Sequence, residues 1–283
     1  MRPTDLPPLQ RLIERLVQLL NRPADARLVC ITARCAHGVK SIDIDRPTLA
    51  LVLRGAKQVT AGQRAETLQP GDLLAMAPGA RLDVVNRPDA ADGRYLTLGI
   101  PLCDEVLAAT RLLWVGALQP GGMHFARVPG DALVHELAAL ADAVTADDEA
   151  QARLAVLNLL MVLARRGCSD LLLPRPPTLA AQVRRLVAQA PARGWQSADF
   201  EQALAMSGAT LRRRLADEGT PLREAIAQSR LACALELLYT TRSPVETVAH
   251  RVGYQSVESF ARRFRERYGL EATAIGNAVA ESA

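Results

Sequence analysis

Residues 243–269 read SPVETVAHRVGYQSVESFARRFRERYG, and this pattern predicts two short helices separated by a tight turn. One face of the first helix is apolar, with Val245, Val248, Ala249 and Val252. Ser243 is the expected N-cap and Pro244 the first helical residue, since proline loses no hydrogen bond at that position. Gly253 predicts the end of this helix, because glycine adopts a positive φ without a steric penalty.

The second helix of this segment is expected to begin after Ser256, which is its N-cap. Ser259, three residues on, stands where a full capping box has Glu or Gln. Phe260 and Phe264 lie four residues apart and are predicted to face the core. The outer face carries Val257, Glu258, Ala261 and Arg262, with Arg263, Arg265 and Arg267 on its flanks. A helix-turn-helix lays such an outer face in the major groove of DNA.

A similar pattern occurs earlier, in the stretch FEQALAMSGATLRRRLADE at residues 200–218. Phe200 and Leu204 share one face of a first helix, and residues 206–208 are expected to form the turn. Leu211 and Leu215 then point inward. The outward residues of this second helix are Ala209, Arg212 and Arg213. One Arg-rich helix is often only a solvated surface, whereas two such patterns at matching phase indicate DNA binding.

A connecting helix is predicted between the two patterns. Leu222 to Leu238 contains no Pro or Gly, and its apolar residues recur at helical spacing. A helix of about 20 residues is roughly 30 Å long, which is close to the roughly 34 Å of one turn of B-DNA. We expect this helix to hold the two recognition helices in successive major-groove segments, so that one chain reads an asymmetric site.

These residues resemble the DNA-binding domain of AraC/XylS-type transcription regulators from about Thr178 to Ile275. The matching positions are Trp195, Met206, Ser207, Thr210, Leu211, Arg213, Glu218, Gly219, Thr220, Arg230, Leu231, Ala234, Leu237, Leu238, Val248, Ala249, Val252, Gly253, Tyr254, Ser256, Ser259, Phe260, Arg263, Phe264, Tyr268 and Gly269. Three features depart from the family's pattern. Ala205 replaces the usual Gly, Glu201 replaces a small apolar residue, and residues 271–273 replace the usual Ser-Pro.

The resemblance implies which side chains meet DNA. The first recognition helix would present Ala209, Arg212 and Arg213, and the second would present Val257, Glu258 and Arg262. Arg263, on the flank of the second helix, is a further candidate contact. Arg262 is expected to read a base, because a guanidinium can bond bidentately to guanine. The other arginines are expected to hold phosphates. From residue 175 onward the chain has 15 Lys or Arg against 11 Asp or Glu, so the net charge of +4 lies in this part.

Composition bounds the cellular setting. The 283 residues suffice for about two domains, and no apolar run approaches the roughly 20 residues of a membrane helix. The five cysteines are odd in number and scattered, which suits a reducing compartment. The start of the chain does not resemble a signal peptide. We therefore expect a cytoplasmic protein without a membrane partner.

A Pro-rich linker at residues 173–178 separates the expected domains, 1–173 and 178–283. The predicted strands before it are residues 28–32, 48–54, 57–61, 64–68, 72–77, 81–86 and 94–100. Short strands at regular spacing indicate an antiparallel barrel or sandwich. Helices are expected at residues 9–20, 131–144 and 148–166, the last with Leu154, Leu157, Met161 and Val162 on its apolar face. The predicted fold class is α+β, with an N-terminal antiparallel β-barrel and flanking helices, then an all-α tandem helix-turn-helix domain.

Residues 69–72 and 76–79 resemble the turns of cupin-type barrels, and the resemblance extends to the cupin-like N-terminal domain of some AraC-type regulators. Metal-binding cupins need several histidines, but His37 is the only histidine in the barrel region. We therefore expect no metal, no cofactor and no catalytic residue. Cys30 and Cys35 are interpreted as core and surface residues, with a redox pair as the alternative.

A barrel of this size can hold one small ligand. The candidate contacts to a polar or anionic effector are Arg34, His37, Arg54, Lys57 and Arg81, each of which has a surface position as its alternative. The expected partners are promoter double-stranded DNA, a small-molecule effector and a second copy of the chain, with RNA polymerase as a further candidate. Two other hypotheses stay open. The barrel could serve as an interaction module for a partner protein, or the chain could be a cupin enzyme with an appended DNA-binding domain.

Overall fold

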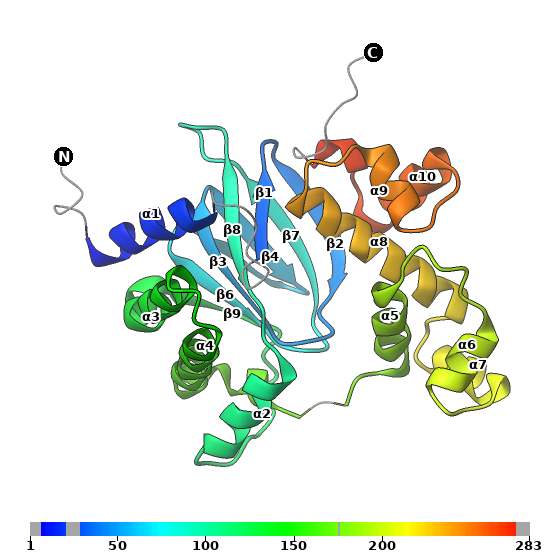
Figure 1. Cartoon of the computed structure of the whole chain (residues 1–283), viewed down its shortest axis with the longest axis horizontal. Helices are drawn as coiled ribbons and strands as arrows, with labels where there is room; N and C mark the ends of the chain where they lie inside the picture. The colour runs from blue at the N-terminus through cyan, green and yellow to red at the C-terminus, as the bar shows by residue number, and fades with distance from the viewer. Residues whose placement is uncertain (1–6, 21–28, 175, 276–283) are drawn as a thin grey trace. The chain divides into compact units, whose positions relative to one another are not determined.

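The computed structural model describes residues 7–20, 29–174 and 176–275. The chain divides into two compact units, Met1–Pro174 and Arg175–Ala283, which Figure 1 shows as a β-rich part and an all-helical part. Among the residues described, none of the helices is long and apolar enough to cross a membrane.

Two antiparallel sheets form the centre of the N-terminal unit (Figure 1). The five-stranded sheet has the order β1 (Val29–Ala33), β8 (Tyr95–Ile100), β3 (Thr48–Arg54), β6 (Asp72–Met76) and β9 (Phe125–Pro129). The four-stranded sheet has the order β2 (His37–Asp43), β7 (Arg81–Arg87), β4 (Ala56–Ala61) and β5 (Arg64–Leu68). Within the described residues the strands pair as two separate sheets, which is a sandwich-like form of the predicted architecture.

All seven predicted strands are confirmed to within one residue at the ends that the structure describes. Leu28, the predicted start of the first strand, lies outside the described residues. Two strands were not predicted, β2 and β9. In β2, the positive φ of Ser41 (+55°) accompanies a bulge between Val39 and Ile42, so the strand lacks a regular alternation. In β9 only five residues pair, and the last is a proline.

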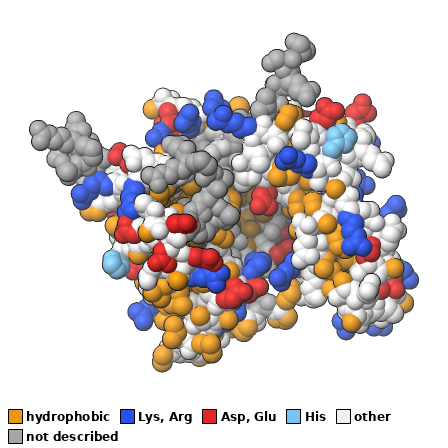
Figure 2. Space-filling view, in the orientation of Figure 1, with side chains coloured by type: hydrophobic (Ala, Val, Ile, Leu, Met, Phe, Trp, Pro, Cys, Tyr) orange, Lys and Arg blue, Asp and Glu red, His pale blue; other side chains and the backbone are white. Residues whose placement is uncertain are grey.

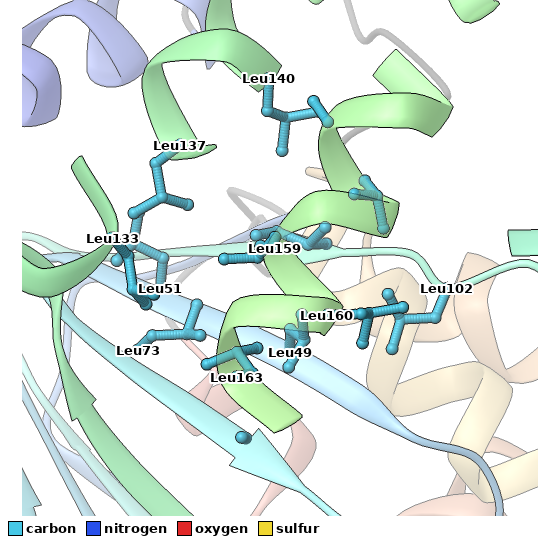
Figure 3. Close-up of a cluster of buried hydrophobic side chains, with 14 of the residues drawn as sticks. Leu49, Leu51, Leu73, Leu102, Leu133, Leu137, Leu140, Leu159, Leu160 and Leu163 are labelled. Atoms are coloured by element: carbon cyan, nitrogen blue, oxygen red, sulfur yellow. The ribbon is translucent and has the colours of Figure 1, made fainter. Parts of the chain in front are cut away.

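Helices pack on the five-stranded sheet and complete the main core of the unit. Their bounds are α1 (Pro8–Leu20), α2 (Asp104–Leu113), α3 (Val134–Thr145) and α4 (Glu149–Leu163). Figure 3 shows leucines from β3 and β6 meeting leucines from α3 and α4, among them Leu51, Leu137 and Leu159. Short helical turns extend these helices: η2 (Gly130–Leu133), η3 (Ala164–Cys168) and η4 (Ser169–Leu172).

The predicted apolar face of α4 is only partly correct. Leu157 and Val162 are partly buried and pack against the core, whereas Leu154 is 48% exposed and Met161 is only partly buried. The residues of α4 that are buried are Ala152, Ala155, Val156, Leu159, Leu160 and Leu163. Because α4 carries apolar residues on most of its circumference, periodicity alone could not select the face that packs. The helix also ends at Leu163 rather than residue 166, and a π turn with Gly167 at a φ of +94° follows it.

The helix α2 was not predicted, and its C-terminal end carries an apolar surface. Leu112 is 87% exposed and Val115, just after the helix, is 95% exposed. Figure 2 shows hydrophobic side chains gathered around this end of α2. The opposite side of α2 is buried in the core through Val106 and Leu107.

The described residues of the C-terminal unit form helices and no strand. Their bounds are α5 (Leu179–Gln189), α6 (Ser197–Ala203), α7 (Gly208–Asp217), α8 (Leu222–Thr240), α9 (Val245–Arg251), α10 (Val257–Tyr268) and the turn η5 (Ala272–Ala274). The predicted connecting helix is confirmed as α8. Thr178 is confirmed as the cap of α5, since its Oγ1 accepts a hydrogen bond from the backbone N–H of Ala181 at 3.1 Å.

The predicted start of α9 is wrong by one residue. Pro244, with φ −57° and ψ 148°, is itself the N-cap, and Val245 is the first helical residue. The extended ψ of Pro244 keeps it outside the helix. Ser243 therefore lies one position before the cap rather than at it.

The assignment of the buried face of α4 can be tested by truncation. Leu159→Ala is expected to lower the free energy of unfolding of the N-terminal unit by about 2–5 kcal/mol, because it opens a cavity in the leucine core. Leu154→Ala is the matched control on the same helix and is expected to change it by no more than about 0.5 kcal/mol. Urea denaturation measures both variants. Equal losses would contradict the assignment.

Candidate nucleic-acid interface

The first helix-turn-helix is held by a capping box and an aromatic stack. The backbone N–H of Gln196 donates to the carboxylate of Asp199 at 2.7 Å, and the side chain of Gln196 caps α6 in return. The ring of Trp195 stacks on that of Phe200 with centroids 5.1 Å apart. Phe200 is fully buried, and so are Leu211 and Leu215 of α7. The inward-facing residues predicted for α7 are therefore confirmed.

The turn of this motif places a non-glycine residue in the left-handed region. Ala205 has a φ of +49°, and the N–H of Met206 then returns to the carbonyl of Glu201 at 3.1 Å. The turn lies at residues 204–206, two residues earlier than predicted, because Ser207 is already the N-cap of α7. A Cβ in this conformation costs roughly 1–2 kcal/mol. This is the position at which the chain departs from the glycine of the regulators that it resembles.

Ala205→Gly is expected to stabilise the C-terminal unit by about 0.5–1 kcal/mol, because glycine relieves the strain of the positive φ but loses more backbone entropy on folding. Ala232→Gly, at an exposed position inside α8, is expected to destabilise the unit by a similar amount. Thermal unfolding measures both variants, and the melting temperature should rise for Ala205→Gly and fall for Ala232→Gly. A loss of stability for both would show that Ala205 is not strained.

Glu201, the second departure, has a defined environment. Its Oε1 accepts a hydrogen bond from the Ser197 hydroxyl at 2.9 Å. A Cβ added to Gly208 would meet the same Oε1 at 2.3 Å. The carboxylate therefore fills the space beside Gly208 at the start of α7, and a glycine there leaves room for it.

The second helix-turn-helix is built from α9 and α10. Ser256 is confirmed as the cap of α10, since its Oγ accepts from the N–H of Ser259 at 3.2 Å. Gly253 has a φ of +85°, as its predicted role in the turn requires. Inside the motif, the rings of Phe260 and Phe264 lie 5.4 Å apart and both side chains are fully buried. These inward-facing residues of α10 are confirmed.

The candidate DNA contacts lie on the outer faces of α7 and α10. Six are on the surface: Ala209, Arg212, Arg213, Glu258, Arg262 and Arg263 are exposed, while Val257 is partly buried. In the described part of the chain, no ion pair is formed by the four arginines of this set, which are Arg212, Arg213, Arg262 and Arg263. Arg265, on the flank of α10, instead pairs with Glu271 at 2.7 Å. The unpaired guanidinium groups are thus available to phosphates and base edges.

The structure separates the five candidate effector contacts. Arg34, Arg54 and Arg81 are exposed, and two of them form ion pairs, Arg54 with Asp92 and Arg81 with Asp43. The predicted grouping of these three with His37 and Lys57 around one ligand is therefore not what the structure shows. Strand periodicity could not assign them, because their positions lie at strand ends, where alternation gives no direction.

His37 and Lys57 are buried and belong to one polar cluster. The Lys57 ammonium donates to Oδ1 of Asn86 at 2.7 Å and lies 5.4 Å from the centre of the Tyr95 ring. The amide nitrogen of Asn86 lies 3.3 Å from Nε2 of His37. Tyr95 comes from the other sheet, so the cluster lies between the two sheets. Sequence reasoning missed Asn86, although its pairing with Lys57 across two strands places it there.

The burial of this cluster shifts its pKa values. Burial lowers the pKa of Lys57 to about 8, and no ion pair to a carboxylate accompanies it in the described residues. Burial is the main cause that lowers the pKa of His37, and the charge of Lys57 lowers this pKa further. The hydrogen bond to the carbonyl of Cys35 acts in the opposite direction and raises it. Both groups can therefore lose their charge more readily than exposed ones.

The free energy of unfolding is expected to depend on pH because of this buried ammonium. Between pH about 8 and 10.5, the unfolded chain binds more protons at Lys57 than the folded one, so its contribution to stability rises with pH. Below about pH 8 the buried charge is fully present and destabilising. Relative to wild type, Lys57→Met should therefore be most stabilising near neutral pH, and this advantage should shrink as pH rises.

Lys40→Met is the control for this measurement, because Lys40 is exposed and is the only other lysine of the chain. Lys40→Met removes the same charge from an exposed position and gives the baseline for comparison. Urea denaturation over this pH range measures both differences, and a constant difference for Lys57→Met would contradict the assignment of a depressed pKa.

No cluster of metal ligands occurs in the parts of the chain that the structure describes. No group of three or more His, Cys, Asp or Glu residues there could hold a metal ion. Cys30 and Cys35 are both free thiols. Burial raises the pKa of the Cys30 thiol to about 11, whereas Cys35 is exposed. A protonated thiol at neutral pH is a poor nucleophile.

Part of this chain is similar in sequence to known transcription regulators. A family model described as a helix-turn-helix domain matches residues 201–277. The urease operon transcriptional activator of Escherichia coli is 31% identical over 88 residues, 31% of this chain and 30% of that protein. The regulator VqsM of Pseudomonas aeruginosa is 36% identical over 74 residues, 26% of this chain and 23% of that protein. The chain spans between 21% and 35% of the length of such relatives.

The fold of the whole chain also has a counterpart among solved structures. The crystal structure of apo ToxT from Vibrio cholerae strain SCE256 superposes with a TM-score of 0.64. The match covers 90% of this chain and 100% of that chain at 13% sequence identity. The N-terminal antiparallel sheets and the C-terminal helical unit are therefore combined in one chain in both proteins.

Proposed function

We propose that this chain, whose residues 201–277 match a helix-turn-helix family model, is a sequence-specific DNA-binding transcription regulator of the AraC type. The observation that carries the proposal is the pair of recognition helices, α7 and α10, in one compact unit. Each has a fully buried inner face and unpaired arginines on its outer face. Relatives with transcription-regulator names are 31% identical over 88 residues and 36% identical over 74 residues. We assign no catalytic residue and no cofactor.

The proposed contacts divide into two kinds. Arg262 reads a base, while Arg212, Arg213 and Arg263 hold phosphates. The remaining contacts on the two outer faces are Ala209, Val257 and Glu258. Because the exposed charge of the two helices is mostly Arg, the affinity for DNA should fall as the salt concentration rises.

Selection from a random duplex library with the full chain tests the proposal. A binding regulator should enrich one motif and bind it about 10³-fold or more tightly than scrambled DNA at physiological salt. The affinity should decrease with salt on both kinds of DNA. Enrichment of no motif would overturn the proposal of sequence-specific recognition.

Arg262→Ala is expected to weaken binding to the selected motif by about 1–3 kcal/mol and to relax the preference at one base position. Arg265→Ala is the matched control, because Arg265 lies on the same helix but pairs with Glu271. It should leave the base preference unchanged. Fluorescence anisotropy with cognate and scrambled duplexes measures both, and an equal loss of Arg262→Ala on the two duplexes would contradict base reading.

The proposed effector is a small acid bound by the buried cluster of Lys57, Asn86 and His37. An ammonium between the two sheets without a carboxylate partner favours an anionic ligand. ToxT, which shares the fold, has a structure described as bound to an unsaturated fatty acid. Effector binding would shift the population of DNA-binding arrangements. The exposed Arg34, Arg54 and Arg81 are assigned no part in this site.

A thermal-shift series with fatty acids of increasing chain length tests the effector proposal. A ligand that binds only the folded state raises the apparent melting temperature. The shift should be lost in Lys57→Met and kept in Lys40→Met, since Lys40 is exposed. A shift of equal size in both variants would place the acid elsewhere.

A homodimer, contact with RNA polymerase and a cytoplasmic location are further parts of the proposal. The resemblance to AraC-type regulators implies that the helices at residues 131–144 and 148–166 mediate dimerisation, and both helices bury leucines in the core of the unit. Their outer faces, including Leu154, remain for a partner copy. Sedimentation equilibrium of the full chain with and without DNA measures this association. A monomer under both conditions would remove the homodimer from the proposal.

A further inference from the structure

Arg230, near the middle of α8, connects the two helix-turn-helix motifs through three backbone carbonyls. Its Nε donates to the carbonyl of Pro191 at 2.9 Å, and its Nη2 donates to the carbonyl of Arg193 at 2.9 Å. Its Nη1 donates to the carbonyl of Gly253 at 3.3 Å. Pro191 and Arg193 lie in the loop that leads into α6, whereas Gly253 forms the turn between α9 and α10. One side chain is thus bonded to both motifs.

The two motifs also touch directly at this point. A Cβ added to Gly253 would lie 2.8 Å from the carbonyl oxygen of Pro191 and 2.9 Å from Cα of Ala192. The same Cβ would lie 3.1 Å from Cζ of Arg230. Only glycine permits this approach, and it also provides the φ of +85° that the turn requires. The turn of the second motif therefore packs against the loop of the first with no side chain between them.

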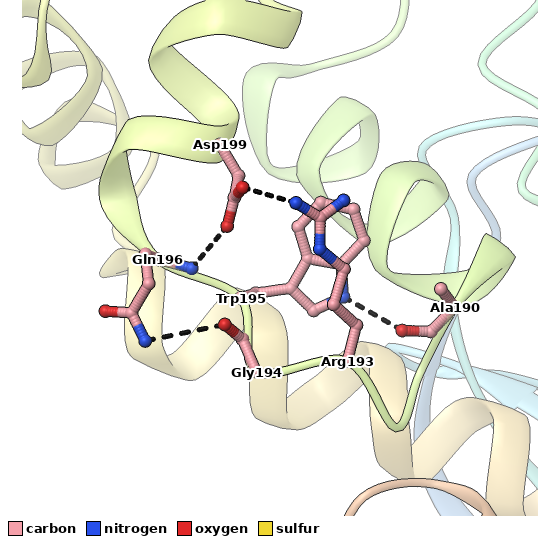
Figure 4. A network of polar contacts seen from close by, with 6 residues as sticks. All are labelled: Ala190, Arg193, Gly194, Trp195, Gln196 and Asp199. Atoms are coloured by element: carbon pink, nitrogen blue, oxygen red, sulfur yellow. Dashed lines mark hydrogen bonds and ion pairs between the residues drawn. The ribbon is translucent and has the colours of Figure 1, made fainter.

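The loop at residues 190–196 is tied to α6, so that a restraint on the loop reaches the first motif. Figure 4 shows these ties, in which Arg193 pairs with Asp199 at 2.5 Å and the indole N–H of Trp195 donates to the carbonyl of Ala190 at 3.0 Å. The guanidinium of Arg193 also lies over the Trp195 ring, 4.6 Å from its centre. Trp195 in turn stacks on the buried Phe200 of α6. The loop thus links Arg230 to the core of the first motif.

We propose that Arg230 is a positioning residue that fixes the orientation of α7 relative to α10, and thereby sets the spacing between the two DNA segments that the unit accepts. This inference rests on the proposed DNA-binding function. Arg230 itself touches no DNA in this proposal. It acts through the carbonyls of Pro191, Arg193 and Gly253.

The chemistry of arginine suits this role. The planar guanidinium presents five N–H donors in a fixed fork, so it can hold three carbonyls at defined angles. A lysine has the same charge but a compact ammonium on a flexible stem, and it cannot reproduce that geometry. Arg230→Lys therefore keeps the charge and removes the fork, whereas Arg230→Met removes both.

The first test measures the restraint without DNA. Spin labels would be introduced through unnatural amino acids at Ala216 of α7 and Glu266 of α10, because the chain has five native cysteines. Both positions are exposed and lie outside the proposed contacts. Double electron–electron resonance on the full chain is expected to give a narrow distance distribution for wild type. The distribution should be broader for Arg230→Lys and broadest for Arg230→Met.

Arg223→Met is the matched control, because Arg223 lies on the same helix, is exposed and makes no polar contact in the described part of the chain. Its distribution should equal that of wild type. Thermal unfolding checks that each variant is folded at the temperature of measurement. Unchanged distributions in folded Arg230→Lys and Arg230→Met would overturn the proposal.

The second test uses duplexes in which base pairs are inserted or deleted between the two halves of the motif selected by wild type. Wild type should lose about tenfold or more in affinity for each altered spacing, as for other disruptions of a site. Arg230→Lys should bind the altered spacings with a smaller loss, while Arg223→Met should change affinity equally at every spacing. Equal spacing profiles for wild type and Arg230→Lys would overturn the proposal.

The two tests separate this inference from the proposed function. If wild type selects no motif, the proposed function fails, and the distance distributions alone decide whether Arg230 restrains the two motifs. If wild type selects a motif but the Arg230 variants keep both its spacing preference and the narrow distribution, only the inference fails.

Discussion

The packing of short helices on α8 is the constraint on which the C-terminal unit depends. The helices α6 and α9 have seven residues each, which is too short for a stable isolated helix. Buried residues along α8, including Ala225, Leu231 and Leu238, provide the surface on which these motifs pack. One helix is therefore shared by two small cores. Its rigidity, together with the contacts of Arg230, gives the two recognition helices a defined relation to each other.

In the N-terminal unit, the leucine core and the buried polar cluster have opposite effects on stability. The leucines of β3, α3 and α4 make the unit stable. The ammonium of Lys57 opposes folding, because burial of a charge whose partners are a neutral amide and an aromatic ring carries a desolvation penalty. A ligand that supplies the missing negative charge would relieve that penalty. This difference is the physical basis for placing an acidic effector at the cluster rather than at the exposed arginines.

Features that depend on interactions within a few residues could be predicted from the sequence, whereas features that depend on tertiary packing could not. The two helix-turn-helix motifs were predicted well because capping by Ser256 and the burial of Phe260 are decided within a few residues. The strands β2 and β9 were missed because β2 is bulged and β9 ends in a proline and lacks a regular alternation of buried and exposed residues. The buried face of α4 was predicted only in part because the helix is apolar on several sides. Only its neighbours select which side packs.

The sequence by itself determined the α+β class, the tandem motifs and the outward placement of Arg212, Arg213 and Arg262, since helical periodicity and turn chemistry are local properties. The tertiary structure alone decided that His37 and Lys57 meet through Asn86 while the candidate arginines stay at the surface. It also showed that Arg230, one more arginine in the sequence, bonds to both motifs. These contacts join residues far apart in the chain, and their geometry follows from how the elements pack.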